Sequence, residues 1–545
     1  MGAARRGIRT LGTAMSATEL PPADLHLGSF SDHPPWLVDP DAMPWRAPVA
    51  AVRWRTRRQV PELTRPTHLP AGLRFCEVVA HLGSALGLWY LRGRCRGTSA
   101  SRADLSRRLR RAAERLGPTY IKLGQIISSG EGLFPPELVR EFQQLRDRVP
   151  PEDFADVREV VETDLGRRLE DVFSSFDRVP LASASIAQVH AATLRTGEPV
   201  VVKVQRPTVG RLVQRDIRIM AWLAPLLVGR IPVAALANPP ALVELFTETI
   251  TEELDFRLEA QNMLDVARSF AELGQRGYVI PRPHPTLVTP KVLVMERLDG
   301  YPFYEVARIR DAGVDTEEVI RTGMIGFMEG AMIHGIFHGD LHGGNLFVMP
   351  DGRVALLDFG ITARMDERKR LAFLRLMMGA TTNDVRAQLS ALCDLGALPA
   401  DTDLEAVIAD LGLEGPPIDP TTLTPDEMLH EIQEIVKKLL GYGARMPKEL
   451  MLYVKNLVFL DGAIATMAPD LDIFAEIANI SLYFAQTHGE RIAADIGIDP
   501  RSTELDLSGV KGSFGVDPGT ESLTYRDLQQ RRELIRSRFA ARRVS

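Results

Sequence analysis

Two short polar motifs near the middle of the chain constrain the fold more than any other feature. The first runs from His338 to Asn345, and the second from Asp358 to Gly360. Apolar residues lie between them around a turn at Pro350–Gly352, so we expect a small β-hairpin that holds both motifs on rigid backbone. Asn345 and Asp358 would supply oxygen atoms of the kind that Mg²⁺ prefers.

The order and spacing of the motifs, H-x-D-x-x-x-x-N followed by D-F-G, resemble the catalytic and metal-binding loops of protein-kinase-like enzymes. Asp340 would then lie near the attacking oxygen atom. Each motif alone has an ordinary interpretation, because an aspartate beside glycines is usually a turn residue. A zinc site is a further alternative, since His334, His338 and His342 recur at every fourth residue, but the glycines among them disfavour a continuous helix.

The bulk properties limit the class of protein. A chain of 545 residues exceeds one ordinary domain, and 45% hydrophobic with 25% charged residues describes a soluble globular protein. The net charge of −6 argues against nucleic acid as a partner. Cys76, Cys95 and Cys393 form no disulfide framework or zinc motif, which favours a reducing compartment. We expect no clear transmembrane span, because the most apolar stretches, 71–91 and 450–467, contain charged residues.

Two segments precede the first predicted strands. Residues 1–70 are rich in proline and arginine, and we expect a disordered or loosely packed basic leader. Its arginines could contact anionic lipid, although a solvated linker is the better-supported interpretation. Residues 71–175 are predicted to form a helical extension, in which a Gly-Pro pair ends one helix and starts the next. That next helix carries Lys122 and Gln125, which by spacing alone are ordinary surface residues.

Residues 176–300 have the pattern of a kinase-like N-lobe. Lys203 lies in a β-branched run, from which it could reach the α- and β-phosphates of a nucleotide as a point charge. An edge-strand lysine is the plain alternative. The loop before this strand consists of small residues: Ala182, Ser183, Ala184 and Ser185. Their Cβ atoms keep the backbone farther from phosphates than a glycine loop would.

A long helix is expected over residues 238–270. At 3.6 residues per turn, one face of this helix gathers Glu252, Asp255, Glu259 and Asn262. We choose Glu259 as the ion-pair partner of Lys203 and expect Glu253 to meet another element. A solvated acidic face is the alternative.

The strand at 292–296 is expected to run into a hinge. Backbone groups near Glu296 and Leu298 could hydrogen-bond the edge of an adenine. Residues 301–480 are predicted to form a mostly helical C-lobe, in which the D-F-G motif leads almost at once into a helix. No Ala-Pro-Glu motif and no long activation segment follow, and peptide substrates dock on that segment. Residues 481–545 are expected to form a C-terminal helical tail.

Taken together, these stretches resemble the UbiB/AarF family of atypical protein-kinase-like proteins over about residues 100–470. The matching stretches are Leu116–Gln125 (with K-x-G-Q), Ala182–Ser185 (the alanine-rich loop), Val202–Pro207, Glu253–Asp255 (E-x-D), His338–Asn345 and Asp358–Gly360. Gly339 departs from the alanine that the family more often has, and Ser183 interrupts the alanine-rich loop. The resemblance implies an α+β, bilobal kinase-like fold with an N-terminal helical extension.

The same resemblance implies a set of site residues and a function. The K-x-G-Q helix would lie over the active site, which makes Lys122, Gln125 and Glu253 active-site residues beside Asp340. The expected ligands are ATP or ADP with Mg²⁺, and the expected activity is that of an ATPase or atypical kinase. The alternatives are a nucleotide-gated scaffold and a small-molecule lipid phosphotransferase.

The resemblance also indicates where such a chain would act. It implies a role in isoprenoid-quinone biosynthesis or membrane lipid homeostasis. Expected partners are anionic lipid, prenyl-quinone-like molecules and quinone-biosynthesis proteins. We expect a cytoplasmic protein that lies peripherally on the cytoplasmic membrane.

Overall fold

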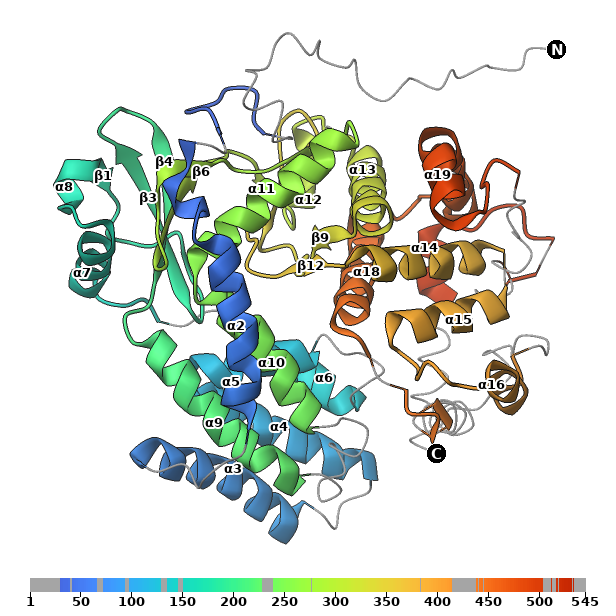
Figure 1. The fold of residues 1–545 in the computed structure, drawn as a ribbon, viewed down its shortest axis with the longest axis horizontal. Coiled ribbons are helices and arrows are strands. Elements are labelled where there is room, and N and C mark those ends of the chain that lie inside the picture. The colour runs from blue at the N-terminus through green and yellow to red at the C-terminus, as the bar shows by residue number, and fades with distance from the viewer. Residues whose placement is uncertain are drawn as a thin grey trace.

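The structure, a computed structural model, places a sheet-containing N-lobe beside a helical C-lobe, with a bundle of helices next to the N-lobe (Figure 1). It describes residues 30–39, 42–65, 72–93, 98–128, 135–145, 150–227, 239–275, 277–382, 384–413, 438–439, 441–444, 446–502, 511, 516–517, 519–531 and 533. Helices and antiparallel sheets together confirm the α+β class expected from the resemblance.

The N-lobe is built on an antiparallel sheet with the strand order β1-β3-β4-β7-β6, in which β2 also pairs with β3. Its elements are α7 (Phe154–Leu165), α8 (Leu169–Val172), β1 (Phe173–Phe176), β2 (Ala182–Ser183), β3 (Ala187–Leu194), β4 (Pro199–Gln205), α11 (Phe256–Glu272), β6 (Pro283–Val288) and β7 (Val292–Glu296). Val200, Val202 and Val204 of β4 are buried on the face that packs against α7. Because side chains alternate along a strand, Lys203 points to the opposite face, toward α11.

The helical extension is a bundle that includes two helices from later in the chain. Its elements are α2 (Val49–Thr64), α3 (Leu73–Arg92), α4 (Thr98–Leu116), α5 (Pro118–Ser128), α6 (Pro136–Phe142), α9 (Val209–Leu227) and α10 (Pro239–Glu253). An ion pair of 2.8 Å between Arg74 Nε and the fully buried Asp216 joins α3 to α9. Gly124 lets α5 lie close to the segment after α6, because a Cβ atom there would be 2.2 Å from Leu145 Cδ1.

The C-lobe contains two small sheets and most of the later helices. Its elements are β5 (Tyr278–Val279), β8 (Tyr301–Pro302), α12 (Val306–Asp311), α13 (Thr316–Glu329), the π-helical turn η4 (Gly330–His334), β9 (Ile336–His338), β10 (Leu346–Val348), β11 (Val354–Leu356), β12 (Thr362–Arg364), α14 (Glu367–Thr381), α15 (Val385–Leu395), α16 (Leu404–Leu411), α18 (Lys448–Met467) and α19 (Ile473–Ile496). The sheets have the orders β5-β11-β10-β8 and β12-β9. Tyr453 of α18 stacks on Phe327 of α13 with ring centroids 4.9 Å apart, which fixes α18 against the core.

The leader differs from its prediction. Residues 43–64 form the 3-10 turn η2 (Pro44–Arg46) and helix α2, which lies across α10 in the centre of the molecule (Figure 1). The indole of Trp36 donates a hydrogen bond to Pro283 O at 3.1 Å, and that of Trp45 donates to His284 O at 3.3 Å. The expectation of a disordered or loosely packed leader is therefore wrong for residues 30–39 and 42–64, because tryptophans anchor the segment to β6. Residues 1–29 lie outside the described ranges.

The long helix expected over 238–270 is two helices. α10 ends at Glu253, and Asp255 accepts a hydrogen bond from Arg257 N at 3.1 Å as the N-cap of α11. Aspartate is a favoured N-cap residue because its carboxylate satisfies an N–H group that the helix leaves unpaired. The prediction that Glu252 and Asp255 share one helix face with Glu259 is therefore wrong, since the helix breaks between them.

One described helix meets the length and composition of a membrane span, and it is α18. This observation is weak evidence, because core helices of soluble proteins meet the same test. The exposed side of α18 carries Val454, Leu457 and Val458. After α19, Leu523 and Tyr525 pack back against Phe474 at the start of that helix. Of the expected C-terminal tail, residues 503–510, 512–515, 518, 532 and 534–545 lie outside the described ranges.

Candidate active site

The hairpin predicted from the sequence is present. β10 and β11 pair in antiparallel fashion with Leu346 opposite Leu356. The pairing continues one step further, where Leu357 N donates to Asn345 O at 3.0 Å. Asn345 precedes β10 and Asp358 follows β11, so the same end of the hairpin carries both motifs.

His338 links the catalytic loop to the D-F-G motif. Its ring is buried, and burial lowers the imidazole pKa although Asp340 and Asp358 lie nearby, so the ring is neutral at pH 7. Nδ1 accepts a hydrogen bond from the backbone N–H of Asp340 at 3.1 Å. Nε2 therefore carries the ring proton, and this N–H group donates a hydrogen bond to the backbone carbonyl of Asp358.

The zinc alternative is not supported. His334 ends η4, His338 ends β9, and His342 lies in the loop that follows. Gly335 adopts a left-handed φ of 70° that stops the helical turn, so the three rings do not share a helix face. In the described part of the chain, no group of three or more His, Cys, Asp or Glu side chains is placed to hold a metal ion.

Lys203 lies between two carboxylates. Its Nζ atom is 2.7 Å from Oε1 of Glu259 and 3.1 Å from Oδ2 of Asp358, so the predicted ion pair with Glu259 is present. Burial opposes the charge on Lys203, but the two carboxylates outweigh it and raise the lysine pKa. Burial also raises the pKa of Glu259, to about 7, against the attraction of Lys203. The lysine is therefore charged at neutral pH.

The peptide groups of Phe359 attach the D-F-G motif to α11. The Phe359 N–H donates to Glu259 Oε1 at 3.4 Å, and its carbonyl accepts from Asn262 Nδ2 at 2.9 Å. The phenyl ring is fully buried. The helix that holds Lys203 through Glu259 therefore also holds the backbone beside Asp358.

The K-x-G-Q helix α5 reaches the same site. Lys122 Nζ is 3.0 Å from Glu253 Oε1 at the end of α10, and both side chains are mostly buried. Its positive charge contributes to lowering the pKa values of Asp340 and Asp358. Gln125 is partly buried one turn farther along α5. Lys122 is thus an interior residue and not the surface residue that its spacing alone suggests.

Lys455 of α18, which the sequence analysis did not single out, forms an ion pair with Asp340. Each of the two side chains is 23% exposed, so most of the pair is out of water. Burial opposes the charge on Asp340, but Lys455, Lys122 and His342 together hold the pKa of its carboxyl well below the usual range. Asp340 is therefore ionised at neutral pH.

The next residue of α18, Asn456, fixes the backbone of the catalytic loop. It is fully buried, and its Oδ1 atom accepts a hydrogen bond from Leu341 N at 3.0 Å. Its Nδ2 group donates to the carbonyl of His338. A lysine followed by an asparagine in the apolar stretch 448–467 is the sequence signal that could have identified both residues.

Asn345 and Asp358 offer different oxygen atoms to a metal ion. Asn345 is buried, its Oδ1 accepts from His342 N at 3.1 Å, and its Nδ2 donates to Asp340 O. The Asp358 side chain is 52% exposed. Desolvation opposes its ionisation, but Lys203 and the Gly360 N–H lower its pKa below the usual range.

This donor set fits Mg²⁺. The ion is usually held by one or two protein oxygen ligands and completes its octahedral shell with phosphate oxygens and water. An ionised carboxylate that faces solvent, Asp358, meets that requirement. The carboxamide oxygen of Asn345 lies at the same end of the hairpin as a second candidate.

Gly339 is explained by its neighbours. A Cβ atom at this position would lie 2.8 Å from Ile361 Cγ2 and 3.1 Å from Leu452 Cδ1. These distances are shorter than ordinary carbon–carbon contacts, so an alanine would require both side chains to move. Glycine in place of the family's usual alanine therefore leaves space for Ile361 to pack beneath the loop.

The alanine-rich loop is fixed by Arg206, a third residue whose role the sequence analysis missed. Ala182–Ser183 forms β2, and Ser185 is buried. Arg206 donates from Nη2 to Ser183 Oγ at 2.9 Å and from Nε to Ala184 O at 3.0 Å. A loop held in this way keeps one conformation, unlike a flexible glycine loop.

The predicted hinge residues have structural neighbours. The Glu296 N–H donates to Arg282 O at 2.9 Å, and its carboxylate accepts from Arg282 Nη1 at 3.2 Å and from Ser31. Leu298 packs with Val279 and Ala355. The Glu296 side chain therefore binds the leader. If residue 296 contacts an adenine, the contact would be made by its backbone carbonyl.

Comparison with known proteins is consistent with this geometry. The family model of the ABC1 atypical kinase-like domain matches residues 144–391. An uncharacterized protein of Mycobacterium tuberculosis is 36% identical over 372 residues, which cover 68% of this chain and 76% of that protein. The probable protein kinase UbiB of Pseudomonas putida is 33% identical over 382 residues, which cover 68% of this chain and 70% of that protein.

The chain belongs to the UbiB/AarF family of atypical kinase-like proteins. The family match begins just after α6, so helices α2 to α6 lie outside it. A solved structure, the complex of Rv3197 with erythromycin from Mycobacterium tuberculosis, shares 23% identity with this UbiB/AarF chain. The structural match covers 64% of the chain described here and 91% of the Rv3197 chain, with a TM-score of 0.37.

Proposed function

We propose that this chain binds ATP with Mg²⁺ and hydrolyses it slowly, as an ATPase or atypical kinase of the UbiB type. One observation carries the proposal: the Lys203 ammonium lies between Glu259, at 2.7 Å, and Asp358, at 3.1 Å. A lysine paired with a helix carboxylate beside the D-F-G aspartate is the arrangement that positions phosphates in kinases. The same residues would hold ADP after turnover.

Each polar residue then has a distinct role. Lys203 binds the α- and β-phosphates while Glu259 keeps its ammonium group in place. Ionised Asp340 accepts a hydrogen bond from the attacking water or hydroxyl group and orients it. Asn345 and Asp358 are the residues that would hold Mg²⁺, which neutralises phosphate charge when bound.

The remaining site residues enclose the nucleotide. The fixed loop 182–185 covers the phosphates, and the backbone at Glu296 and Leu298 is proposed to meet the adenine. Lys122, Gln125 and Glu253 close the side of the site where a peptide would otherwise bind, which supports water or a small molecule as the acceptor.

A nucleotide-gated scaffold with little turnover is the second candidate, and the Lys122–Glu253 pair favours it. This pair of 3.0 Å, together with the loop fixed by Arg206, restricts the motion that rapid product release needs. A phosphotransferase that acts on a lipid-like molecule would use the same residues, with a hydroxyl group in place of water.

The UbiB relatives support a setting for this activity. We propose a role in isoprenoid-quinone biosynthesis or membrane lipid homeostasis, with prenyl-quinone-like molecules, anionic lipid or quinone-biosynthesis proteins as partners. In this setting the chain is cytoplasmic and lies peripherally on the cytoplasmic membrane. The exposed apolar side of α18 and the basic leader are compatible with contact to a lipid surface.

The first experiment measures phosphate release from Mg·ATP by the purified chain, with and without anionic liposomes. Asp358→Asn should abolish the release, because it removes the charge that faces Lys203 and the metal. Asp351→Asn is the matched control, since Asp351 lies in the exposed turn of the same hairpin and pairs with Arg353. Equal turnover in Asp358→Asn and wild type would refute the assignment. Tight nucleotide binding without turnover in either condition would favour the scaffold.

A further inference from the structure

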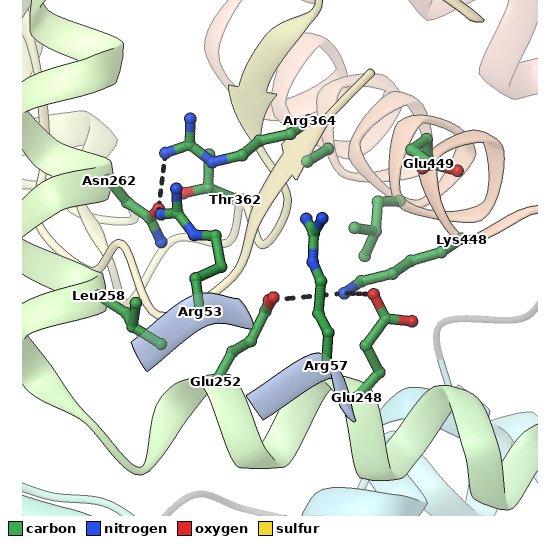
Figure 2. Close-up of a pocket in the computed structure, with 12 residues that line it drawn as sticks. Arg53, Arg57, Glu248, Glu252, Leu258, Asn262, Thr362, Arg364, Lys448 and Glu449 are labelled. Atoms are coloured by element: carbon green, nitrogen blue, oxygen red, sulfur yellow. Dashed lines mark hydrogen bonds and ion pairs between the residues drawn. The ribbon is translucent and has the colours of Figure 1, made fainter. Parts of the chain in front are cut away.

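A polar hollow lies beside the active site, between α2, α10, β12 and α18 (Figure 2). Two adjoining cavities of about 50 Å³ and about 610 Å³ share Arg57, Glu248, Arg364 and Glu449 in their walls. The larger volume lies in the range of small-molecule sites in proteins, about 300–1,000 Å³. The hollow therefore has room for a small organic ligand.

Basic side chains converge on this hollow from several elements. The basic lining residues are Arg53, Arg57, Arg364, Lys369 and Lys448, and the acidic ones are Glu248, Glu252, Asp366 and Glu449. Figure 2 shows Arg53 and Arg57 rising from α2 and Arg364 reaching in from β12. These three arginines approach one space from two elements that are about 300 residues apart in sequence.

Most of the carboxylates are already paired with the lysines. Lys448 Nζ lies 3.2 Å from Glu248 and 3.7 Å from Glu252, and Lys369 Nζ lies 2.9 Å from Glu449. These contacts neutralise the lysines within the wall. Three carboxylates thus face two lysines, and none of the three forms an ion pair with an arginine of α2.

Arg53 and Arg57 have no carboxylate partner within the described ranges. Arg53 Nη2 donates to the neutral oxygen of Asn262 at 3.1 Å. Burial, and next the charge of Arg364, lower the pKa of Arg53, while the charges of Asp265 and Glu252 oppose this shift. Arg57 points into the hollow without an ion pair or hydrogen bond to any described residue (Figure 2). Two guanidinium groups that share one hollow and form no ion pair with a described carboxylate have N–H donors available for an anion.

We propose that this hollow binds the phosphate group of a small phosphorylated molecule, with Arg53 and Arg57 as its ligands. A guanidinium group offers two parallel N–H donors that match two phosphate oxygens, and neither lysine provides this geometry. A phosphate group fills only a small part of about 610 Å³, which leaves room for an organic remainder next to Arg57. The phosphate belongs either to a soluble ester or to a lipid headgroup.

The site is separate from the proposed nucleotide site and does not depend on it. Arg53 and Arg57 belong to α2, outside residues 144–391 that the ABC1 family model matches. The two sites meet through Asn262, whose oxygen accepts from Arg53 and from Arg364 Nη2 at 2.7 Å, while its nitrogen donates to Phe359 O. A ligand that attracts these arginines therefore changes the hydrogen bonds to Asn262, and through Asn262 the support of the D-F-G backbone.

Titration calorimetry with glycerol 3-phosphate tests the proposal, with glycerol as the uncharged control. The full chain is first saturated with a non-hydrolysable Mg·ATP analogue, so that added phosphate does not enter the nucleotide site. Arg57→Gln is compared with Arg55→Gln, because both residues are exposed on the same helix and only Arg57 lines the hollow. Because a charge-assisted hydrogen bond contributes about 1.5–3 kcal/mol, Arg57→Gln should weaken binding by about 10-fold to 150-fold.

The lipid source is tested with phosphatidylcholine vesicles that contain or lack phosphatidic acid. Binding of either phosphorylated probe that is lost in Arg57→Gln and retained in Arg55→Gln supports the site and identifies its source. Absence of binding to both probes overturns the proposal, as does equal weakening in the two variants, which would show general attraction to a basic helix. Failure of the ATP analogue to bind counts against the proposed function alone, because the two arginine variants still report on the hollow.

Discussion

Replacing Lys455 with methionine removes the positive charge that faces Asp340 and keeps an unbranched side chain of similar length. The contact joins α18 to the catalytic loop across 115 residues of sequence. Lys122 and His342 remain near the carboxylate, so Asp340 keeps part of its electrostatic support. The substitution therefore isolates the contribution of α18 to the catalytic aspartate.

The exposure of the pair sets the size of the effect. Exposed ion pairs contribute about 0.2–1 kcal/mol, and removal of one partner from a fully buried pair costs about 3–5 kcal/mol. Both side chains are 23% exposed, which places this pair between the two limits. We expect Lys455→Met to lower the free energy of unfolding by about 1–3 kcal/mol at pH 7. If the same energy holds Asp340 in its working position, turnover should fall by about 5-fold to 150-fold.

The pH dependence separates an electrostatic role from simple packing. Asp340 has a lowered pKa in the folded state, so its stabilising contribution is present above the unfolded pKa of about 3.9 and is lost as the pH falls. The stability difference between wild type and Lys455→Met should thus be full at pH 7 and shrink below about pH 4. In the rate profile, the acidic limb of Lys455→Met should move to higher pH, because the aspartate is protonated more easily.

The assay combines phosphate release with urea unfolding of the same samples, both measured from about pH 8 down to about pH 2.5, below the unfolded pKa of the carboxyl. Lys455→Arg, which keeps the charge, should restore most of the turnover and the position of the acidic limb. A Lys455→Met protein with the turnover and pH profile of wild type would show that Asp340 does not depend on α18. A variant that loses stability but keeps its rate profile would assign Lys455 a purely structural role.

Two further substitutions test other contacts. Lys122→Ala should change turnover or nucleotide preference without unfolding the chain, because the ion pair of Lys122 with Glu253 joins α5 to the active site and not to the hydrophobic core. Kinetics equal to those of wild type would mean that α5 does not act at the active site. Asn456→Ala should lower the unfolding free energy by about 2–4 kcal/mol, since it leaves two buried backbone groups of the catalytic loop without partners. Val454→Ala on the exposed side of α18 is its control in urea unfolding, and a loss below about 1 kcal/mol in Asn456→Ala would contradict the reasoning.

Local patterns in the sequence predict the parts of the site that short stretches determine. The hairpin between Asn345 and Asp358 follows from a turn between two apolar runs, and the direction of Lys203 follows from strand alternation. The pairing of Lys203 with Glu259 could also be chosen in advance, because a kinase-like fold requires a helix carboxylate near that lysine. These features depend on few residues close in sequence or on one known arrangement.

Contacts between distant segments could not be predicted in the same way. Lys455 and Asn456 lie in a helix whose apolar composition indicates only a core position, and their partners are more than 100 residues away. The break before α11 was missed because helical periodicity continues through Leu254, and only the capping bond of Asp255 reveals it. In the leader, Trp36 and Trp45 bind carbonyl groups of β6, and no pattern in a proline-rich segment specifies that partner.

Helix α11 connects the active site to the arginine-lined hollow through two residues one turn apart. Glu259 accepts from the N–H of Phe359, and Asn262 donates to its carbonyl, so both peptide groups of this residue are held by one helix. The oxygen of Asn262 is held in turn by Arg53 and Arg364. An anion that attracts those guanidinium groups changes the support of the peptide next to Asp358. Because coupling between two binding sites is reciprocal, occupancy of the hollow must change nucleotide affinity by the same factor by which nucleotide changes phosphate affinity.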